Sequence, residues 1–549
     1  MKAIGGVGKK WLRLPFIYSV LYSSMIHRLT RVFTMTISIE KIRFGDPDAL
    51  HEYMRQEKEG SRVLFNSFIA PPKANVSQLE NGSKFFIVGP KGSGKTTILL
   101  HLREVLGVKN SALILFKSKI RQEDRSKLDK MTRTIVVEDQ GNFTVETDYR
   151  TVWEWYILKN TFRLINPSDV QEGIDYFQDV SLLLEADQKK FNTLFDTMKV
   201  EGVKGKVNLS VNVGALKSEI GAEIEARRKD IGDNSIDLLD LVRLSQEALK
   251  NIKLKDDVSV RLYIDELEFF LEEMGSGERD RRMVRDLIFS VYSMNQTFHE
   301  AGIDALCYAS VRSEVIHSFP GSSSELNKIM RSFSVSLNWE PAAGQPSSIM
   351  EIFRRKIENS EIEEGEFPSS DPWSKYFPAE IGEKDTQRFL LDMGSHRPRG
   401  VLLCLLSAAE RAWGRTEFIE SDFEDNDNSF AQAMLDEFKD ELSANLFDYE
   451  IDAAFSILRG RHYVFDLPEF TRRTNEASGT IASVNRLKSS KRGEFVVAAL
   501  YRSGVIGNFF KNEQNGLPRQ TWAARGYPDP ILDKPFIVHQ SLQRLLDMV

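Results

Sequence analysis

Apolar residues in this chain fall into short runs that alternate with helical segments. Residues 84–88 form one such run, and further runs lie at residues 112–116, 134–137, 258–264, 305–311 and 333–337. Short runs that are apolar throughout predict strands buried on both faces of a parallel sheet. Helical periodicity follows at residues 97–106 and again at 281–299. This alternation predicts an α/β fold.

Two later regions depart from this pattern. Residues 149–255, rich in helix formers and charge, interrupt the strand runs, and residues 206–213 within them alternate as a hairpin strand would. Residues 347–413 are predicted to be largely helical. Near the C-terminus, predicted helices precede predicted strands: helices at 451–458, 467–476 and 495–503, strands at 504–510, 520–525 and 535–538. Helices followed by a β-hairpin are typical of a winged helix-turn-helix.

The first 34 residues are basic around a short apolar stretch, residues 14–26. A membrane span needs about 20 apolar residues, so this stretch is too short to be one. We interpret the segment as disordered or as a start-site artefact, with translation beginning at Met35. A weak membrane anchor is the alternative interpretation.

Net charge, cysteine content and histidine spacing each argue against one class of protein. The formal net charge of −7 argues against a chain that coats nucleic acid along its whole surface. Cys307 and Cys404 both lie in apolar runs, which predicts buried thiols in a reducing compartment and excludes a disulfide framework. The eight histidines are scattered, and no two Cys or His residues have the spacing of metal ligands, so no structural zinc is expected. We therefore expect a cytoplasmic protein.

A glycine-rich loop follows the first apolar run and precedes a helix. Residues 89–96, Gly-Pro-Lys-Gly-Ser-Gly-Lys-Thr, fit G-x-x-x-x-G-K-[ST] at every position. In such a loop, main-chain N–H groups and the helix N-terminus converge on phosphates. The residues expected to bind nucleotide are Gly89, Pro90, Lys91, Gly92, Ser93, Gly94, Lys95, Thr96 and Thr97. Lys95 should reach the β- and γ-phosphates, and the Thr96 hydroxyl should bind Mg²⁺.

A pair of acidic residues ends the apolar run at residues 258–264. Asp265 is expected to hold Mg²⁺ through water, and Glu266 to polarise the attacking water as a general base. The carboxyl ends of parallel strands are where α/β proteins bind ligands. A strand end capped by solvated acids is the alternative interpretation. Together with the loop, the pair predicts an ATPase with the cofactors ATP and Mg²⁺, in which Lys95 and Glu266 are catalytic.

Polar and basic residues elsewhere are candidates for further contacts with the nucleotide. Ser310 and Arg312 end the 305–311 run and are candidates for the γ-phosphate. Arg331 is a candidate finger that reaches the nucleotide of a neighbouring subunit. Arg397 and Arg399 open a helical run and are candidates that reach back from a lid. An ordinary surface arginine, or a loop serine with satisfied hydrogen bonds, is the alternative for each.

These observations predict four parts. Residues 1–34 are the basic extension, 35–340 a P-loop NTPase core with a parallel sheet and a helical insertion at about 149–255, 341–430 a helical lid, and 431–549 a small winged-helix-like α+β domain.

With both motifs in place, the chain resembles the additional-strand, catalytic-glutamate division of P-loop NTPases, which holds AAA+ and signal-transduction (STAND-like) ATPases. More narrowly, it is similar to a bacterial P-loop ATPase family described from a cyanobacterial member. The shared features are Phe-Gly-Asp-Pro-Asp-Ala at 44–49, the loop at 87–96, Tyr-Ile-Asp-Glu-Leu at 263–267, Arg-Pro-Arg at 397–399 and Phe-Ile-Val-His-Gln-Ser-Leu at 536–542.

The resemblance covers most of residues 44–546 and implies a switch in bacterial stress or phage defence. This family often has Arg where Pro90 stands, and the insertion carries no assignable motif. The first hypothesis is an ATP-driven switch that relays its state to an effector protein or to a homo-oligomer. The second is a DNA-binding loader, with basic residues at 472–473 and 486–492 on the duplex. The third is an ATP-binding scaffold without turnover.

Overall fold

The computed structural model describes most of the chain. The described residues are 36–107, 109–115, 133–139, 142–185, 206–207, 219, 222, 226, 236–267, 276–317, 324–341, 344–424, 428–512 and 516–549. The N-terminal extension lies outside them. None of the helices in these ranges combines the length and the hydropathy that crossing a membrane requires.

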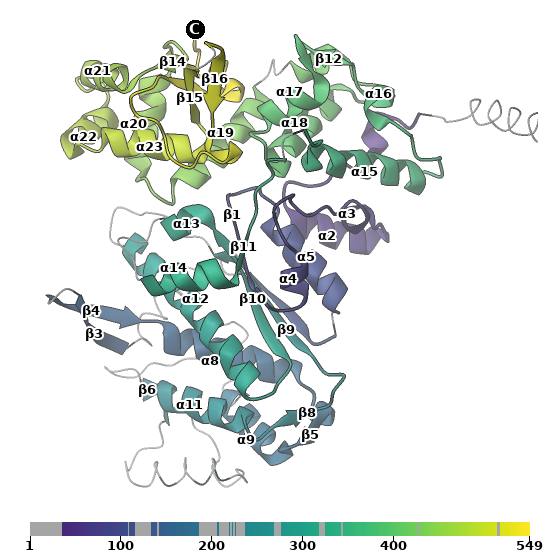
Figure 1. Cartoon of the computed structure of the whole chain (residues 1–549), viewed down its shortest axis with the longest axis vertical. Coiled ribbons are helices and arrows are strands. Elements are labelled where there is room, and N and C mark those ends of the chain that lie inside the picture. Colours follow the sequence, from purple (N-terminus) through teal and green to yellow (C-terminus); the bar gives the residue numbers. More distant parts are fainter. Residues whose placement is uncertain are drawn as a thin grey trace, which may run out of the picture.

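A five-stranded parallel sheet forms the centre of the lower half of the molecule in Figure 1. Its order is β11-β1-β10-β9-β2, and every neighbouring pair is parallel. The strands are β1 (Phe86–Gly89), β2 (Ser111–Leu115), β9 (Val260–Leu267), β10 (Ala305–Arg312) and β11 (Ser334–Ser336). The predicted α/β fold with a parallel sheet is thereby confirmed. One strand, β10, lies between the loop strand β1 and the acidic strand β9.

The run at residues 134–137 does not belong to this sheet, so that prediction was wrong. It forms β3 (Arg133–Asp139), which pairs antiparallel with β4 (Asn142–Asp148) in a sheet of two strands. Strands β3 and β4 are separated in sequence by two residues, one of them a glycine. A hairpin that closes locally needs no crossover connection, whereas a parallel strand does, and the local pairing prevails.

Helices pack against the central sheet and extend below it. Of these, α5 contacts β1, β9 and β10, α8 contacts β2 and β9, and α12 contacts α8 and β10. The helices of this half are α2 (Ala49–Glu59), α3 (Val63–Asn66), α4 (Ser77–Glu80), α5 (Lys95–Leu106), α8 (Arg150–Leu164), α9 (Ile174–Glu185), α11 (Leu238–Leu249), α12 (Ser276–Glu300), α13 (Ser313–His317) and α14 (Ser324–Phe333). Cys307, on β10, is buried, as expected.

Two pairs of short antiparallel strands lie within the insertion at residues 149–255. β5 (Val170–Glu172) pairs with β8 (Lys253–Leu254), and β6 (Lys206–Val207) pairs with β7 (Ile236–Asp237), both antiparallel. The expected hairpin strand at 206–213 is thus present over its first two residues, and 208–213 lie outside the described residues.

The upper half in Figure 1 is built on a second apolar core. That core joins residues 37–44 to the helices that follow the sheet and to the C-terminal region without interruption. The helices here are α15 (Ser348–Glu363), α16 (Pro372–Tyr376), α17 (Thr386–Met393), α18 (Pro398–Arg411) and α19 (Ser429–Leu442), with a small hairpin of β12 (Glu380–Ile381) and β13 (Lys384–Asp385). The domain boundaries given above, including the one at residue 430, stay predictions.

The C-terminal region combines helices with a small antiparallel sheet. Its helices are α20 (Asp448–Leu458), α21 (Leu467–Ala477), α22 (Ala482–Ser490), α23 (Gly493–Ser503) and α24 (Gln540–Gln543). The sheet has the order β14-β17-β15-β16, from β14 (Val464–Phe465), β15 (Ile506–Lys511), β16 (Pro518–Thr521) and β17 (Phe536–Val538). The expected strand at 520–525 ends at Thr521, because a 3-10 turn, Ala523–Arg525, follows and closes at Gly526.

Candidate functional site

The glycine-rich loop connects the end of β1 to the start of α5. Gly89 ends the strand, where a Cβ atom would lie 2.5 Å from the Ser93 hydroxyl oxygen, so a side chain there would displace the loop. Gly94 is the N-cap of α5 and has a left-handed backbone with φ of 91°. Glycine adopts this conformation without steric cost. The sequence thus turns the chain tightly enough to point the N-terminus of α5 into the loop.

Two side chains hold the loop. The Lys95 ammonium lies 3.0 Å from the carbonyl oxygen of Gly89 and 2.9 Å from that of Pro90. From the far side, the Trp339 indole N–H donates to the carbonyl oxygen of Ser93 at 2.9 Å. Trp339 is buried just after β11. The sequence pattern gave no signal for it, because a lone tryptophan more often fills a core.

The acidic strand meets the loop directly. The Thr96 hydroxyl donates to Asp265 Oδ2 at 2.6 Å, and the Ser310 hydroxyl donates to Asp265 Oδ1. Asp265 is 3% exposed. Threonine, aspartate and serine from three elements therefore converge at the head of α5. Among the described residues no group of three or more His, Cys, Asp or Glu is placed to hold a metal. A Mg²⁺ ion needs no such group, because phosphates and water supply most of its ligands.

Glu266 occupies a β-bulge. Ile264 pairs with Ala309 and Leu267 with Val311, so Asp265 and Glu266 together face Ser310. Glu266 has a φ of 61°, in the left-handed region that side chains seldom adopt. Bulges re-aim side chains, and strained backbone of this kind gathers at functional sites. The bulge turns Glu266 toward the cavity in front of the loop, which it lines.

That cavity has a volume of about 310 Å³. Residues of the loop, the acidic strand end and the elements around them line it: Lys91, Gly92, Gly94, Lys95, Thr96, Thr97, Asp265, Glu266, Ser310, Arg312, Arg399 and Asp440. Apolar side chains line it as well, among them Phe44, Pro47, Leu50, Ile69, Pro71, Ile352, Phe353 and Leu402, together with the charged Asp46, Asp48, Glu52 and Lys356. A cleft that combines cations and loop amides with apolar side chains suits a phosphorylated molecule with a flat base.

The predicted arginines lie in three different places. Arg399 and Arg312 line the cavity. Arg397 lies behind the loop, where its guanidinium donates to the carbonyl oxygen of Lys91 at 3.4 Å. Arg331 is exposed on α14, outside the cavity. Its predicted role in a neighbouring subunit stays a prediction.

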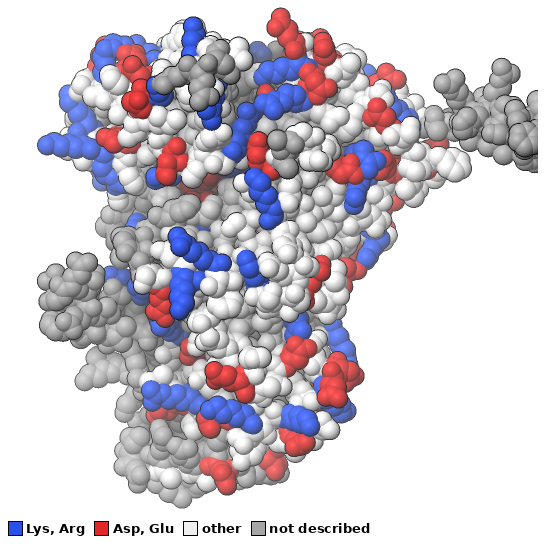
Figure 2. Space-filling model, viewed as in Figure 1, with Lys and Arg blue, Asp and Glu red and all other residues white. Residues whose placement is uncertain are grey.

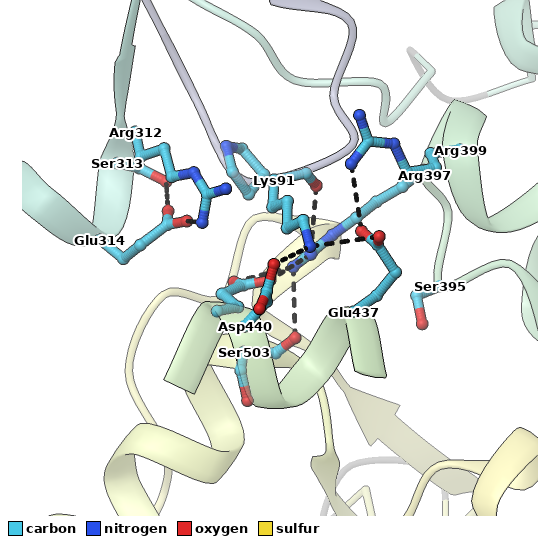
Figure 3. Close-up of polar contacts among 12 residues, drawn as sticks. Lys91, Arg312, Ser313, Glu314, Ser395, Arg397, Arg399, Glu437, Asp440 and Ser503 are labelled. Carbon is cyan, nitrogen blue, oxygen red and sulfur yellow. Dashed lines mark hydrogen bonds and ion pairs between the residues drawn. The ribbon is translucent and has the colours of Figure 1, made fainter. Parts of the chain in front are cut away.

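Helix α19 presents three carboxylates to the cations of the loop and of α18 (Figure 3). Lys91 Nζ lies 2.6 Å from Asp440 Oδ2 and 3.2 Å from Glu437 Oε1. Arg399 Nη1 lies 3.3 Å from Glu437 Oε2, and Arg397 Nη2 lies 3.2 Å from Glu441 Oε1. Positions 437, 440 and 441 lie on one helix face. The sequence shows that spacing and cannot show which cations it meets, since the partners lie about 40 and 350 residues away.

Burial makes this cluster sensitive to charge. It raises the pKa of the Glu441 carboxyl to about 7, against the lowering effect of Arg397, and the negative charge of Glu314 raises it further. Glu314 in turn lies 3.9 Å from Arg312. Cations and carboxylates balance in number here, with Lys91, Arg312, Arg397 and Arg399 facing Glu314, Glu437, Asp440 and Glu441. A phosphate chain in the cavity would compete with the carboxylates.

The comparisons with known proteins are sparse. The chain matches no family model, and no curated protein matches it. It is similar to a crystal structure of Cdc6p from Pyrobaculum aerophilum. The identity is 10%, the match covers 89% of this chain and 91% of that one, and the TM-score is 0.30. A likeness this low supports no functional conclusion.

Proposed function

We propose that the chain is an ATPase that binds ATP with Mg²⁺ in the cavity in front of the loop. The observation that carries the proposal is the meeting of Thr96, Asp265 and Ser310 at the head of α5, with Glu266 beside them on the bulge. The loop N–H groups and Lys95 take the phosphates, and the apolar side chains of the cavity take the base. Thr96, and Asp265 through water, would hold Mg²⁺, and the ion would supply the positive charge that offsets the charge developing on the transferred phosphoryl group.

Glu266 acts as the general base in this scheme. Its carboxylate orients a water molecule and accepts the proton as the water oxygen bonds to the γ-phosphorus and the bond to the β-phosphate oxygen breaks. Lys95 exchanges its two carbonyl partners for phosphate oxygens. Because a charge-assisted hydrogen bond to phosphate is stronger than one to a neutral carbonyl, this exchange is favourable.

We further propose that ATP binding and hydrolysis switch the chain between two conformations. The contacts of α19 with Lys91, Arg397 and Arg399 connect the loop to the upper half of the molecule, and Arg397 also donates to the carbonyl oxygen of Ser503 in α23 at 3.3 Å. When phosphates draw Lys91 and Arg399 into the cavity, these cations leave the carboxylates of α19. Helix α19 then changes position, and an effector protein or another copy of the chain binds the changed surface. A role in bacterial stress or phage defence rests on the family resemblance alone.

The test of the ATPase proposal uses two variants. Lys95→Ala should lose ATP binding, because the loop then lacks its cation. Glu266→Gln should keep ATP binding and stall, because an amide cannot accept the proton. ATP affinity measured by calorimetry and phosphate release measured in parallel separate the two effects. An unchanged ATP affinity in Lys95→Ala would contradict the ATPase proposal. If wild type binds ATP and releases no phosphate, the chain is instead an ATP-binding scaffold without turnover.

The DNA-loader alternative has weaker support. Figure 2 shows basic side chains over α21 and α22, at the upper left, next to acidic ones. Arg472 pairs with Glu469 and Glu476, and Arg492 lies 3.2 Å from the buried Glu450. Two lysines of this group, Lys488 and Lys491, are exposed. Duplex binding that falls steeply with salt and disappears in Lys488→Glu, Lys491→Glu would support the loader. Absent binding would remove it.

A further inference from the structure

A second cavity lies between the turn that joins α17 to α18 and the C-terminal sheet. Its volume is about 250 Å³. Its polar lining comes from both sides: Lys384, Asp392, Ser395, His396 and Arg397 before α18 or at its start, and Gln520, Arg525, His539, Gln540 and Gln543 from the C-terminal region. The rings of Tyr463 and Trp522 line it as well. Apart from Arg397, none of these residues takes part in the proposed ATPase site.

Positive charge outweighs negative charge in this cavity. Three basic side chains share the Asp392 carboxylate: Arg525 Nη2 at 2.7 Å, Arg388 Nε at 3.2 Å and Lys384 Nζ at 3.3 Å. Although burial raises the pKa of Asp392, the hydrogen bond with His396 and the positive charges of Arg388 and Arg525 lower it well below the usual range. Among the described residues that line the cavity, Asp392 is the one acidic side chain.

Arg525 is held at the wall with donors to spare for a ligand. Its side chain is 19% exposed, and its Nη2 and Nε atoms lie 2.7 Å and 3.1 Å from His396 Nε2. Burial and the nearby charge of Arg388 lower the pKa of Arg525, although Asp392 and Glu340 oppose this. The Arg525 guanidinium contacts the His396 imidazole and a carboxylate, Asp392, that also pairs with Arg388 and Lys384. Its positive charge is therefore only partly neutralised. An added anion would restore the balance.

The backbone beside the cavity is strained. Ser395 and His396 both have left-handed conformations, with φ of 54° and 53°. Ser395 is fixed there by its hydroxyl, which lies 2.9 Å from Nε2 of the buried His539. Two successive non-glycine residues in this region persist only where the surroundings impose it, and such positions cluster at ligand clamps. The Arg-Pro-Arg motif at 397–399 and the motif at 536–542 both contribute to the lining, through Arg397 and His539 among others.

We propose that this cavity binds a small molecule through a phosphate group, with Arg525 and Lys384 as the principal donors. A guanidinium fork beside an ammonium group matches phosphate oxygens. The cavity is smaller than the roughly 300 to 1,000 Å³ typical of drug-sized ligands, which excludes a folded partner and favours a compact phosphate compound.

The test is calorimetric titration of the full chain with inorganic pyrophosphate, without nucleotide. Wild type should bind at two sites. Lys95→Ala should lose the loop site and keep the cavity site, whereas Arg525→Gln should do the opposite, with binding at the cavity weakened about ten- to a hundredfold. If wild type shows no pyrophosphate site that Lys95→Ala removes, the proposed ATPase is contradicted. If wild type shows no site that Arg525→Gln weakens, the present inference is contradicted.

Two further variants make the test decisive. Arg519→Gln, on β16, makes the same change in charge outside the cavity, where Arg519 donates to the Tyr527 hydroxyl at 3.1 Å, and should bind like wild type. Lys384→Gln alters a side chain that is 43% exposed, so it should fold even if Arg525→Gln does not, which thermal unfolding will show. Pyrophosphate binding by Lys384→Gln as tight as that of Arg519→Gln, at both sites, would overturn the proposal.

Discussion

The contact between Lys91 and Asp440 gives the sharpest test of the proposed switch. Lys91 lies in the loop with its side chain 11% exposed, and its ammonium is 2.6 Å from Asp440 Oδ2. Asp440 also lines the cavity in which the phosphates are proposed to bind. If phosphates compete with Asp440 for Lys91, removing the negative charge of Asp440 should strengthen ATP binding. If Asp440 instead positions Lys91 for ATP, the same change should weaken it.

The size of the effect follows from exposure. The Asp440 side chain is 44% exposed, so water screens the ion pair. Exposed pairs contribute about 0.2 to 1 kcal/mol, and hydrogen bonds to charged groups about 1.5 to 3 kcal/mol in more buried settings. A value of about 1 kcal/mol is appropriate for this half-exposed pair, and it corresponds to roughly a fivefold change in an equilibrium constant. Asp440→Asn should therefore lower the Kd for ATP about fivefold.

The assay is calorimetry with ATP and Mg²⁺ in the Glu266→Gln background, in which the ligand is not consumed. Asp436→Asn is the matched control, because Asp436 lies on the same helix, is exposed, and accepts a hydrogen bond from Gln432 at 2.9 Å. It should leave the Kd unchanged. A Kd that rises in Asp440→Asn, or one equal to that of Asp436→Asn, would refute competition for Lys91.

Three further predictions concern the base, the loop and stability. Glu266→Gln should reduce the rate of phosphate release by about a hundredfold or more, as loss of a general base does, and an unchanged rate would assign the base to another residue. Trp339→Phe removes the donor to the Ser93 carbonyl at 2.9 Å, so ATP affinity should fall roughly fivefold, whereas Trp373→Phe in α16 should not change it. Burial lowers the pKa of His539 to about 4. The unfolded chain therefore binds more protons between pH 6.5 and about 4, and the free energy of unfolding should fall by up to about 3 kcal/mol across that window. His539→Gln should remove this part of the pH dependence in urea titrations, and an unchanged slope would contradict the assignment.

The elements near the proposed site could be predicted from local sequence. The loop at 89–96, the strand before it and the helix after it are encoded by contiguous residues, because glycine conformations and helical periodicity act over a few positions. The same holds for the acidic end of β9. The sequence also predicted that Asp265 and Thr96 serve one Mg²⁺ ion, although they lie 169 residues apart, since strands of one parallel sheet end at the same edge.

Other features were decided only by the tertiary structure. Pairing of β3 with β4 removed one predicted strand from the central sheet, since local closure prevailed over a parallel register. The bulge at Glu266 depends on its register against β10, which no local pattern encodes. The carboxylates of α19 and the support from Trp339 come from helix and loop positions far along the chain. Long-range ion pairs and hydrogen bonds depend on which surfaces the two apolar cores bring together, and that information does not reside in any short segment.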